Sequence, residues 1–207
     1  SKENQIDQGI KIIRFSTKFN RLRFMQGLLD RFAHYVYRYL PIKLQRIFDY
    51  FCLRAQGPYC PDLLEYLEKE QESYDLFIFF TYLYYPTAEG VLRIKKPKLI
   101  IPTAHDENYF YKNYVKNIFE DIDFILPSTL AEKKLISSNY GCSDKMTQLG
   151  IYLDDLSDKN LNFFSLEESY LLYLGRIGKS KSIQQVIKFL SLYNEKLESP
   201  VKLVLAG

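Results

Sequence analysis

The sequence predicts a mixed α/β protein built on largely parallel sheets. Short apolar runs recur along the chain, longer amphipathic stretches separate them, and helix-capping sequences directly follow two of the runs. Most of the runs are almost entirely apolar, as is typical of strands buried on both faces of a sheet. The expected strands are residues 10–15, 76–80, 98–101, 124–126, 170–174 and 201–205.

The spacing of these strands also predicts where helices and a domain boundary lie. About three helices are expected between the first two strands, where Pro41 and Pro61 suit the first turn of a new helix. The polar stretch 154–168 separates two strand-rich blocks. We therefore expect one domain over residues 1–153 and a second over residues 154–207.

Two later helices are indicated by capping boxes. Thr129 is followed three residues later by Glu132, and Ser182 is followed by Gln185 at the same spacing. In such a box the hydroxyl accepts the backbone N–H of the third residue, whose own side chain reaches back to the cap. Both pairs precede apolar runs with helical periodicity, so helices should follow the strands at 124–126 and 170–174.

The composition excludes several classes of protein. Of 207 residues, 47% are hydrophobic and 26% are charged, which is ordinary for a globular protein. No apolar run approaches the roughly 20 residues that cross a bilayer, and the first residues lack a secretory signal, so we expect a cytoplasmic protein. Three cysteines without a CxxC pair or a nearby histidine predict neither a zinc site nor disulfides. They are Cys52, Cys60 and Cys142.

The first quarter of the chain is strongly basic. Residues 1–54 contain eleven Lys and Arg and four Asp and Glu, a formal charge of +7, whereas the remainder carries −4 of the overall +3. Between Arg14 and Arg54 the cations alternate with Phe and Tyr. This pattern fits an anionic membrane surface, a nucleic acid, or an amphipathic helical pair with a solvated basic face and an aromatic core face. We expect no nucleic-acid partner and allow peripheral attachment at the inner face of a membrane.

The most specific local signal is the segment YLLYLGRIGKSKSIQQVIKFL. An apolar strand ends at Gly175, three cations follow at Arg176, Lys179 and Lys181, and a helix then begins. Open α/β sheets bind ligands at the carboxyl ends of their strands. Glycine lets the backbone approach an anion, and an Arg fork with a Lys charge suits a diphosphate, although both cations could simply decorate a solvated loop.

This segment, followed by a second strand ending in Leu-Ala-Gly, resembles the start of the donor-side domain of family 4 glycosyltransferases. The resemblance implies the GT-B architecture, in which two Rossmann-like domains face each other. It also implies that Gly175 opens a diphosphate-binding loop in which Arg176 and Lys179 contact the donor. Ser180 stands where the family usually has glycine after the lysine, so Lys181 is a competing alignment.

The resemblance extends upstream over roughly residues 70–207. It runs through DLFIFFTYLYYPTAEGV, KLIIPTAHDENYF, DFILPSTLAEKKLI and TQLGIYLDD, which are similar to later strands of the acceptor-side domain and the crossover into the donor side. His105 matches the loop where this family often places an active-site histidine. A catalytic role for His105 and a purely structural one both remain open.

Other residues near His105 are candidates for the acceptor side. Asp106 and Glu107 could orient the imidazole, contact acceptor hydroxyls, or serve as loop or helix-start carboxylates. Tyr84, Tyr85 and Thr87 follow the strand at 76–80, where an aromatic loop could stack on an acceptor or pack into the core.

The resemblance implies a glycosyltransferase that moves a sugar from a nucleotide-diphosphate donor to a glycan, lipid-linked or small hydroxylated acceptor. It further implies retention of anomeric configuration and neither a cofactor beyond the nucleotide sugar nor an obligatory metal.

The family's first strand with its glycine-rich loop, and its donor-side glutamate pair, have no counterparts here. We therefore expect both domains to be incomplete, with two strands lacking between 10–15 and 76–80 in the sheet. The alternative is a non-catalytic scaffold that binds a membrane or partner through residues 14–54.

Two other motifs are set aside on position and spacing. Asp121 and Asp123 have the D-x-D spacing of metal-dependent glycosyltransferases, but they precede their strand and so lie at the edge away from the ligand-binding loops. Gly178-Lys179-Ser180 is similar to the end of a phosphate-binding loop, which requires glycine where the chain has Tyr173.

Overall fold

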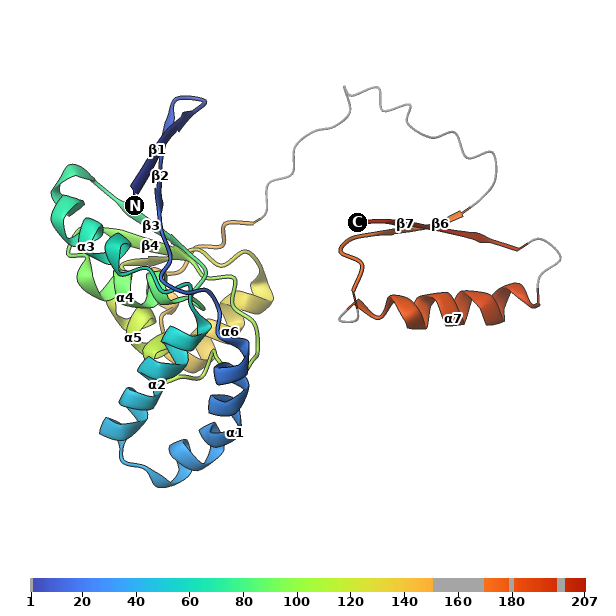
Figure 1. Cartoon of the computed structure of the whole chain (residues 1–207), viewed down its shortest axis with the longest axis horizontal. Coiled ribbons are helices and arrows are strands. Elements are labelled where there is room, and N and C mark those ends of the chain that lie inside the picture. The colour runs from blue at the N-terminus through green and yellow to red at the C-terminus, as the bar shows by residue number, and fades with distance from the viewer. Residues whose placement is uncertain (1, 151–169, 179–180, 197–199) are drawn as a thin grey trace. The chain divides into compact units, whose positions relative to one another are not determined.

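The computed structural model describes residues 2–150, 170–178, 181–196 and 200–207. The chain divides into two compact units, Ser1–Tyr152 and Leu153–Gly207 (Figure 1). Each unit combines helices with parallel strands, which confirms the predicted mixed α/β class. Among the described helices, none is long and apolar enough to cross a membrane.

Among the described residues, the first unit contains two sheets and six α-helices, and the second contains one two-stranded sheet and one α-helix. The strands of the first unit are β1 (Lys2–Asp7), β2 (Ile10–Phe15), β3 (Phe77–Phe80), β4 (Lys98–Ile101) and β5 (Phe124–Ile125). Its helices are α1 (Arg23–Tyr39), α2 (Ile42–Gln56), α3 (Pro61–Glu70), α4 (Tyr85–Arg93), α5 (Asn113–Asp121) and α6 (Leu130–Tyr140), with short 3₁₀ helices at Gln71–Ser73 and Ser143–Lys145. The second unit contains β6 (Tyr170–Leu174), α7 (Ile183–Asn194) and β7 (Lys202–Ala206).

A three-stranded parallel sheet, in the order β3-β4-β5, forms the centre of the first unit. Helices α4 and α5 connect its strands, and both supply side chains to the core on one face of the sheet. On the other face Ile78, Phe80 and Phe124 are 62%, 65% and 58% exposed. The prediction that these strands are buried on both faces is therefore wrong for the described structure, because helices cover only one face.

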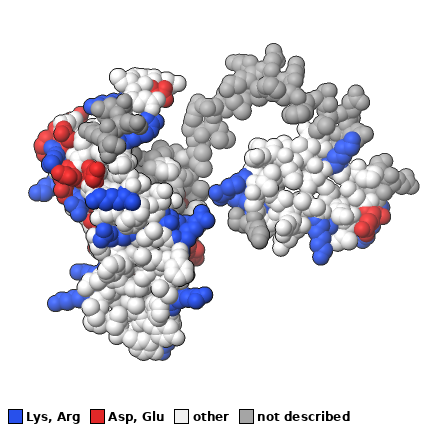
Figure 2. All heavy atoms as spheres, in the orientation of Figure 1, with Lys and Arg blue, Asp and Glu red and all other residues white. Residues whose placement is uncertain are grey.

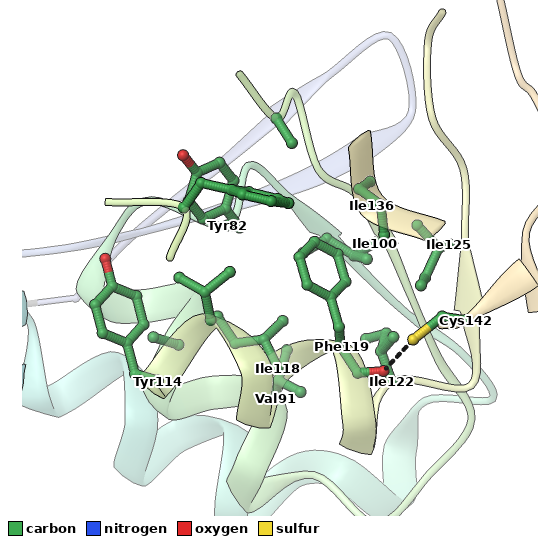
Figure 3. Close-up of a cluster of buried hydrophobic side chains, with 14 of the residues drawn as sticks. Tyr82, Val91, Ile100, Tyr114, Ile118, Phe119, Ile122, Ile125, Ile136 and Cys142 are labelled. Carbon is green, nitrogen blue, oxygen red and sulfur yellow. Dashed lines mark hydrogen bonds between the residues drawn. The ribbon is translucent and has the colours of Figure 1, made fainter. Parts of the chain in front are cut away.

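The core lies between this sheet and helices α2 to α6 and is rich in aromatic rings (Figure 3). Phe110 has no exposed surface, and its ring centroid lies 5.9 Å from that of Tyr82 and 5.1 Å from that of Tyr140. Phe119 of α5 is likewise fully buried, 6.2 Å from Phe110. Ring pairs at such distances stabilise a core beyond the area that they bury.

The strand at 10–15 was expected to belong to the parallel sheet, and this expectation is wrong. β2 pairs antiparallel with β1, from Asp7 opposite Ile10 to Lys2 opposite Phe15. The two-residue loop has φ of 46° at Gln8 and 82° at Gly9, which is the left-handed pair that a tight hairpin turn requires. The sequence of β1 is polar and gave no strand signal, and residues 5–15 of the hairpin are exposed or half-buried.

Three helices fill the region between β2 and β3, as predicted. Pro61 is the first residue of α3, whereas Pro41 is the N-cap of α2 and so lies just outside the helix. The interpretation of α1 and α2 as a pair with an aromatic core face holds only in part. The pair forms, but Phe24, Phe32 and Tyr39 are 89%, 54% and 68% exposed.

Cys52, Cys60 and Cys142 are all free and buried. Burial raises the pKa of the Cys52 thiol to about 11 and also raises that of Cys142. Thiols in such surroundings are mostly protonated near neutral pH and react slowly.

The buried aromatic core predicts a large difference between two phenylalanines of the same unit. Replacing Phe119 with Ala removes a ring that neighbours cannot replace, so the free energy of unfolding should fall by about 3 to 5 kcal/mol. Phe124→Ala is the matched control, because that ring is 58% exposed, and it should cost less than about 1.5 kcal/mol. Urea denaturation of both variants measures the difference, and equal losses would contradict this placement of the core.

Candidate functional site

A cavity of about 550 Å³ lies where β4 and β5 end and α6 begins. It is formed by the loop that follows β4 and by the first turns of α6. Its lining residues are Thr103, Ala104, His105, Asp106, Ser128, Thr129, Ala131, Glu132 and Leu135. The cavity is therefore at the carboxyl edge of the parallel sheet, where α/β proteins bind their ligands.

The carboxylate of Glu132 joins the two loops that form this cavity. One carboxylate oxygen accepts the Ala104 N–H at 2.6 Å, and the other accepts the Ser128 N–H at 2.8 Å. The Glu132 side chain is largely buried, at 6% exposure. Because one side chain binds the ends of both strands, it sets the distance between the His105 loop and the start of α6.

The predicted capping box at Thr129 is half confirmed. Thr129 is the N-cap of α6, and its hydroxyl accepts the backbone N–H of Glu132 at 3.1 Å. The carboxylate of Glu132 does not return to the Thr129 N–H. It binds the backbone of Ser128 and Ala104 instead, which ties the helix start to the neighbouring strand end.

Two threonines directly after adjacent strands have left-handed backbone. Thr81 follows β3 with φ of 62°, and Thr103 follows β4 at its second position with φ of 51°. A β-branched residue adopts this conformation at a cost on the order of 1 to 3 kcal/mol, and such residues concentrate at functional sites. The strain at Thr103 is next to the loop that carries His105.

His105 lies in the cavity wall and is exposed. The two carboxylates beside it face other partners. Asp106 accepts a hydrogen bond from the Tyr111 hydroxyl at 2.7 Å, and Glu107 accepts one from the Tyr82 hydroxyl at 2.7 Å. Burial and the Glu107 bond raise the pKa of Tyr82, so this hydroxyl remains a donor at neutral pH. Neither carboxylate orients the imidazole in this structure.

The three acceptor-side candidates that follow β3 lie outside the cavity wall. Tyr85 and Thr87 are buried at the start of α4, where Tyr85 packs edge to face on Tyr59 at 5.0 Å. The Thr87 hydroxyl donates to the Phe80 carbonyl at 3.5 Å. Tyr84, the N-cap of α4, is 38% exposed and is the ring of this group that is open to a ligand.

The candidate diphosphate loop lies in the second unit, between β6 and α7. Gly175 has φ of 145°, which favours glycine, and its N–H donates to the Ala206 carbonyl of β7 at 2.8 Å. Arg176 is exposed, and its backbone carbonyl accepts the Tyr173 hydroxyl at 3.2 Å. Lys179 lies outside the described residues, whereas Lys181 is described and exposed.

A second cavity, of about 440 Å³, lies beside this loop at the start of α7. It is lined by Ile177, Gly178, Ser182, Ile183, Gln184, Gln185, Ile187 and Leu205. The capping box expected at Ser182 is wrong. Ser182 precedes the helix, but its φ of 54° is left-handed rather than extended, and its side chain makes no capping bond.

The D-x-D pair has a structural role. Asp121 forms an ion pair with the buried Lys98 ammonium at 2.6 Å, and Asp123 accepts the Lys98 backbone N–H at 2.9 Å. The same ammonium donates to the carbonyls of Val91 and Ile94 at the end of α4. Over the described part of the chain, no group of His, Cys, Asp and Glu is placed to hold a metal ion.

No protein-family model matches this chain, and no curated protein matches it either. The sequence predicts His105 and the Gly175 loop as candidate site residues, and nothing in it indicates that Glu132 links the strand ends. The capping-box spacing was the one available signal, and it pointed to Thr129 rather than to Ala104.

Glu132 should be a strong stability determinant of the first unit. In Glu132→Gln an amide N–H₂ replaces one acceptor oxygen and faces a buried backbone N–H, so the free energy of unfolding should fall by about 1 to 3 kcal/mol. Glu120→Gln is the control, because the Glu120 carboxylate forms an exposed ion pair with Lys116, and this change should cost less than about 0.5 kcal/mol. Chemical denaturation measures the free energy of unfolding of both variants. An unchanged value for Glu132→Gln would show that the Glu132 carboxylate does not hold the two loops together.

Proposed function

We propose that this protein is a nucleotide-sugar-dependent glycosyltransferase of the GT-B architecture. The observation that carries the proposal is the element from β6 through Gly175 and Arg176 to α7 and the parallel strand β7. This is the order that resembles the donor-side domain of family 4 glycosyltransferases. The reaction moves a sugar from a nucleotide-diphosphate donor to a glycan, lipid-linked or small hydroxylated acceptor, with retention of configuration.

The geometry of this loop supports a diphosphate as its ligand. The turn at Gly175 has no side chain to prevent close approach of an anion, and Arg176 is exposed at the carboxyl end of β6. The first N–H groups of α7 and the positive end of its dipole lie next to the same loop. Fixed donors and cations there would bind the phosphates of a nucleotide sugar.

In the proposed reaction, the bond between the sugar C1 and the diphosphate oxygen breaks, and its electron pair stays on the diphosphate. The acceptor hydroxyl oxygen bonds to C1, and its proton is transferred to the departing diphosphate. Negative charge therefore grows on the diphosphate in the transition state. Cations held at the loop stabilise that state more than the ground state.

The cavity of the first unit is the proposed binding site for the acceptor or for the transferred sugar. His105 brings a group that can donate or accept a hydrogen bond near neutral pH to the carboxyl edge of the sheet. The hydrogen bond from the Ala104 N–H to the Glu132 carboxylate and the left-handed backbone of Thr103 fix the loop that carries His105. Such preorganisation is what a catalytic or substrate-binding side chain requires.

His105→Ala should lower turnover by roughly tenfold or more, because a sugar-facing hydrogen bond would be lost. The measurement is release of nucleoside diphosphate by the full-length enzyme with a donor found by screening. His34→Ala is the matched control, since His34 is the other histidine of the chain and lies on α1. Wild-type turnover in a folded His105→Ala variant would give His105 a structural role only.

Arg176→Met and Lys179→Met should slow turnover by about thirtyfold to a thousandfold each, while changing ground-state donor affinity less. The Arg176 and Lys179 side chains would stabilise negative charge on the diphosphate, and this charge develops as the sugar bond breaks. Lys188→Met, an exposed lysine on α7, serves as the charge-matched control and should leave turnover unchanged. If Lys181→Met slows turnover and Lys179→Met does not, Lys181 is the lysine that binds the diphosphate. Near wild-type turnover in the Arg176, Lys179 and Lys181 variants would refute the donor-site assignment.

A further inference from the structure

Helix α1 carries a continuous stripe of exposed apolar side chains. Its members are spaced by four, four, three and four residues, so they lie on one helical face. They are Phe24, Leu28, Phe32, Tyr35 and Tyr39. Each is between 46% and 89% exposed, and no part of the described structure covers them. We call this set the α1 stripe.

Basic residues border the α1 stripe. Arg31 and Arg38 lie four residues before and three residues after Tyr35, which places both along one edge of the stripe. Helix α2, which packs against α1, adds the exposed Lys43 and Arg46. It also exposes apolar side chains, including Ile47 at 53% and Phe51 at 52%.

The opposite face of the helix pair is fastened to the body of the first unit. The Asp49 carboxylate of α2 accepts the Asn113 backbone N–H at 3.1 Å and its side-chain N–H at 2.9 Å, and it also accepts the Tyr37 hydroxyl of α1. Lys112 lies over the Tyr37 and Tyr109 rings, with its ammonium 5.3 Å and 5.1 Å from their centroids. Because these contacts attach one face of the helix pair to the rest of the first unit, the α1 stripe lies on the face that points away from it.

The charge on the helix pair is of one sign on its outer side. Helices α1 and α2 contain two acidic residues, Asp30 and Asp49. Asp49 is buried, and Asp30 accepts the Tyr109 hydroxyl at 3.0 Å on the anchored side. In Figure 2 the end of the unit formed by these helices in Figure 1 is largely uncharged, with Lys and Arg side chains around it.

We propose that the α1–α2 pair docks this protein on an anionic lipid bilayer. The α1 stripe enters the boundary between headgroups and acyl chains, and Arg31, Arg38 and the α2 cations bind lipid phosphates. Helices that lie in a membrane interface combine large apolar side chains on one face with Lys and Arg at its borders, as this pair does. The inference is independent of the proposed transferase activity, since it concerns where the protein binds and not what it transfers.

The chain contains no tryptophan, so a single introduced Trp reports on one position. Phe32→Trp places the reporter on the α1 stripe, and Phe189→Trp is the matched control on α7, with Phe32 54% and Phe189 70% exposed. Vesicles of phosphatidylcholine with added phosphatidylglycerol should shift the Phe32→Trp emission to the blue. Brominated acyl chains should quench that emission. The Phe189→Trp emission should change in neither experiment.

Sedimentation with the same vesicles tests the cations. Arg31→Gln with Arg38→Gln should lower the partition coefficient by about thirtyfold at low salt. Lys134→Gln with Lys188→Gln removes the same charge from exposed sites on α6 and α7 and should lower it less than threefold. In a Tyr35→Trp chain, the double change Phe24→Ser with Phe32→Ser should also abolish the blue shift of the Trp emission.

Two results would overturn the proposal. Equal partitioning of the wild-type chain onto neutral and anionic vesicles at low salt would show that the cations do not select lipid. A blue shift of the Phe32→Trp emission that grows with protein concentration in the absence of lipid would assign the α1 stripe to a second copy of the chain.

Discussion

The buried carboxylate of Glu132 is the constraint on which the candidate site of the first unit depends. Parallel pairing brings the carboxyl ends of β4 and β5 to one edge, but it leaves the backbone N–H groups beyond those ends without partners in the sheet. Glu132 accepts one N–H from each loop, while its own N–H is accepted by the Thr129 hydroxyl. One side chain thereby sets the start of α6, the path of the His105 loop and the width of the cavity between them.

At the amino edge of the sheet, a buried cation takes the place that the Glu132 carboxylate has at the carboxyl edge. There the Lys98 ammonium is buried and binds the carbonyl oxygens that end α4, and Asp121 neutralises it. Lys98 satisfies carbonyl groups at the end of α4, and Glu132 satisfies backbone N–H groups in the two loops beyond the strands. Between them lies the apolar core that contains Phe110 and Phe119. Polar groups therefore position the two edges, and apolar packing stabilises the layer between them.

The two surfaces with functional proposals differ in how they relate to this core. The cavity at His105 is part of the packed unit, and its geometry follows from the sheet register. The α1 stripe is outside the core, so the fold does not require its aromatic character, and the proposed role at a lipid surface would account for it. The Asp49 and Lys112 contacts connect the two regions, because they join α1 and α2 to the segment that precedes α5.

By itself, the sequence determined the α/β class, all six expected strands, the three helices before β3 and the capping Thr129, since apolar periodicity and capping are local properties. It also indicated the cavity edge at His105, because strand ends in a parallel sheet share one side. Only the tertiary structure decided that β2 joins a hairpin, that the sheet is covered on one face, that Ser182 is left-handed and that Glu132 reaches Ala104. The coverage of the sheet and the reach of Glu132 depend on which distant segments pack together, and hydrophobic pattern alone does not specify that choice.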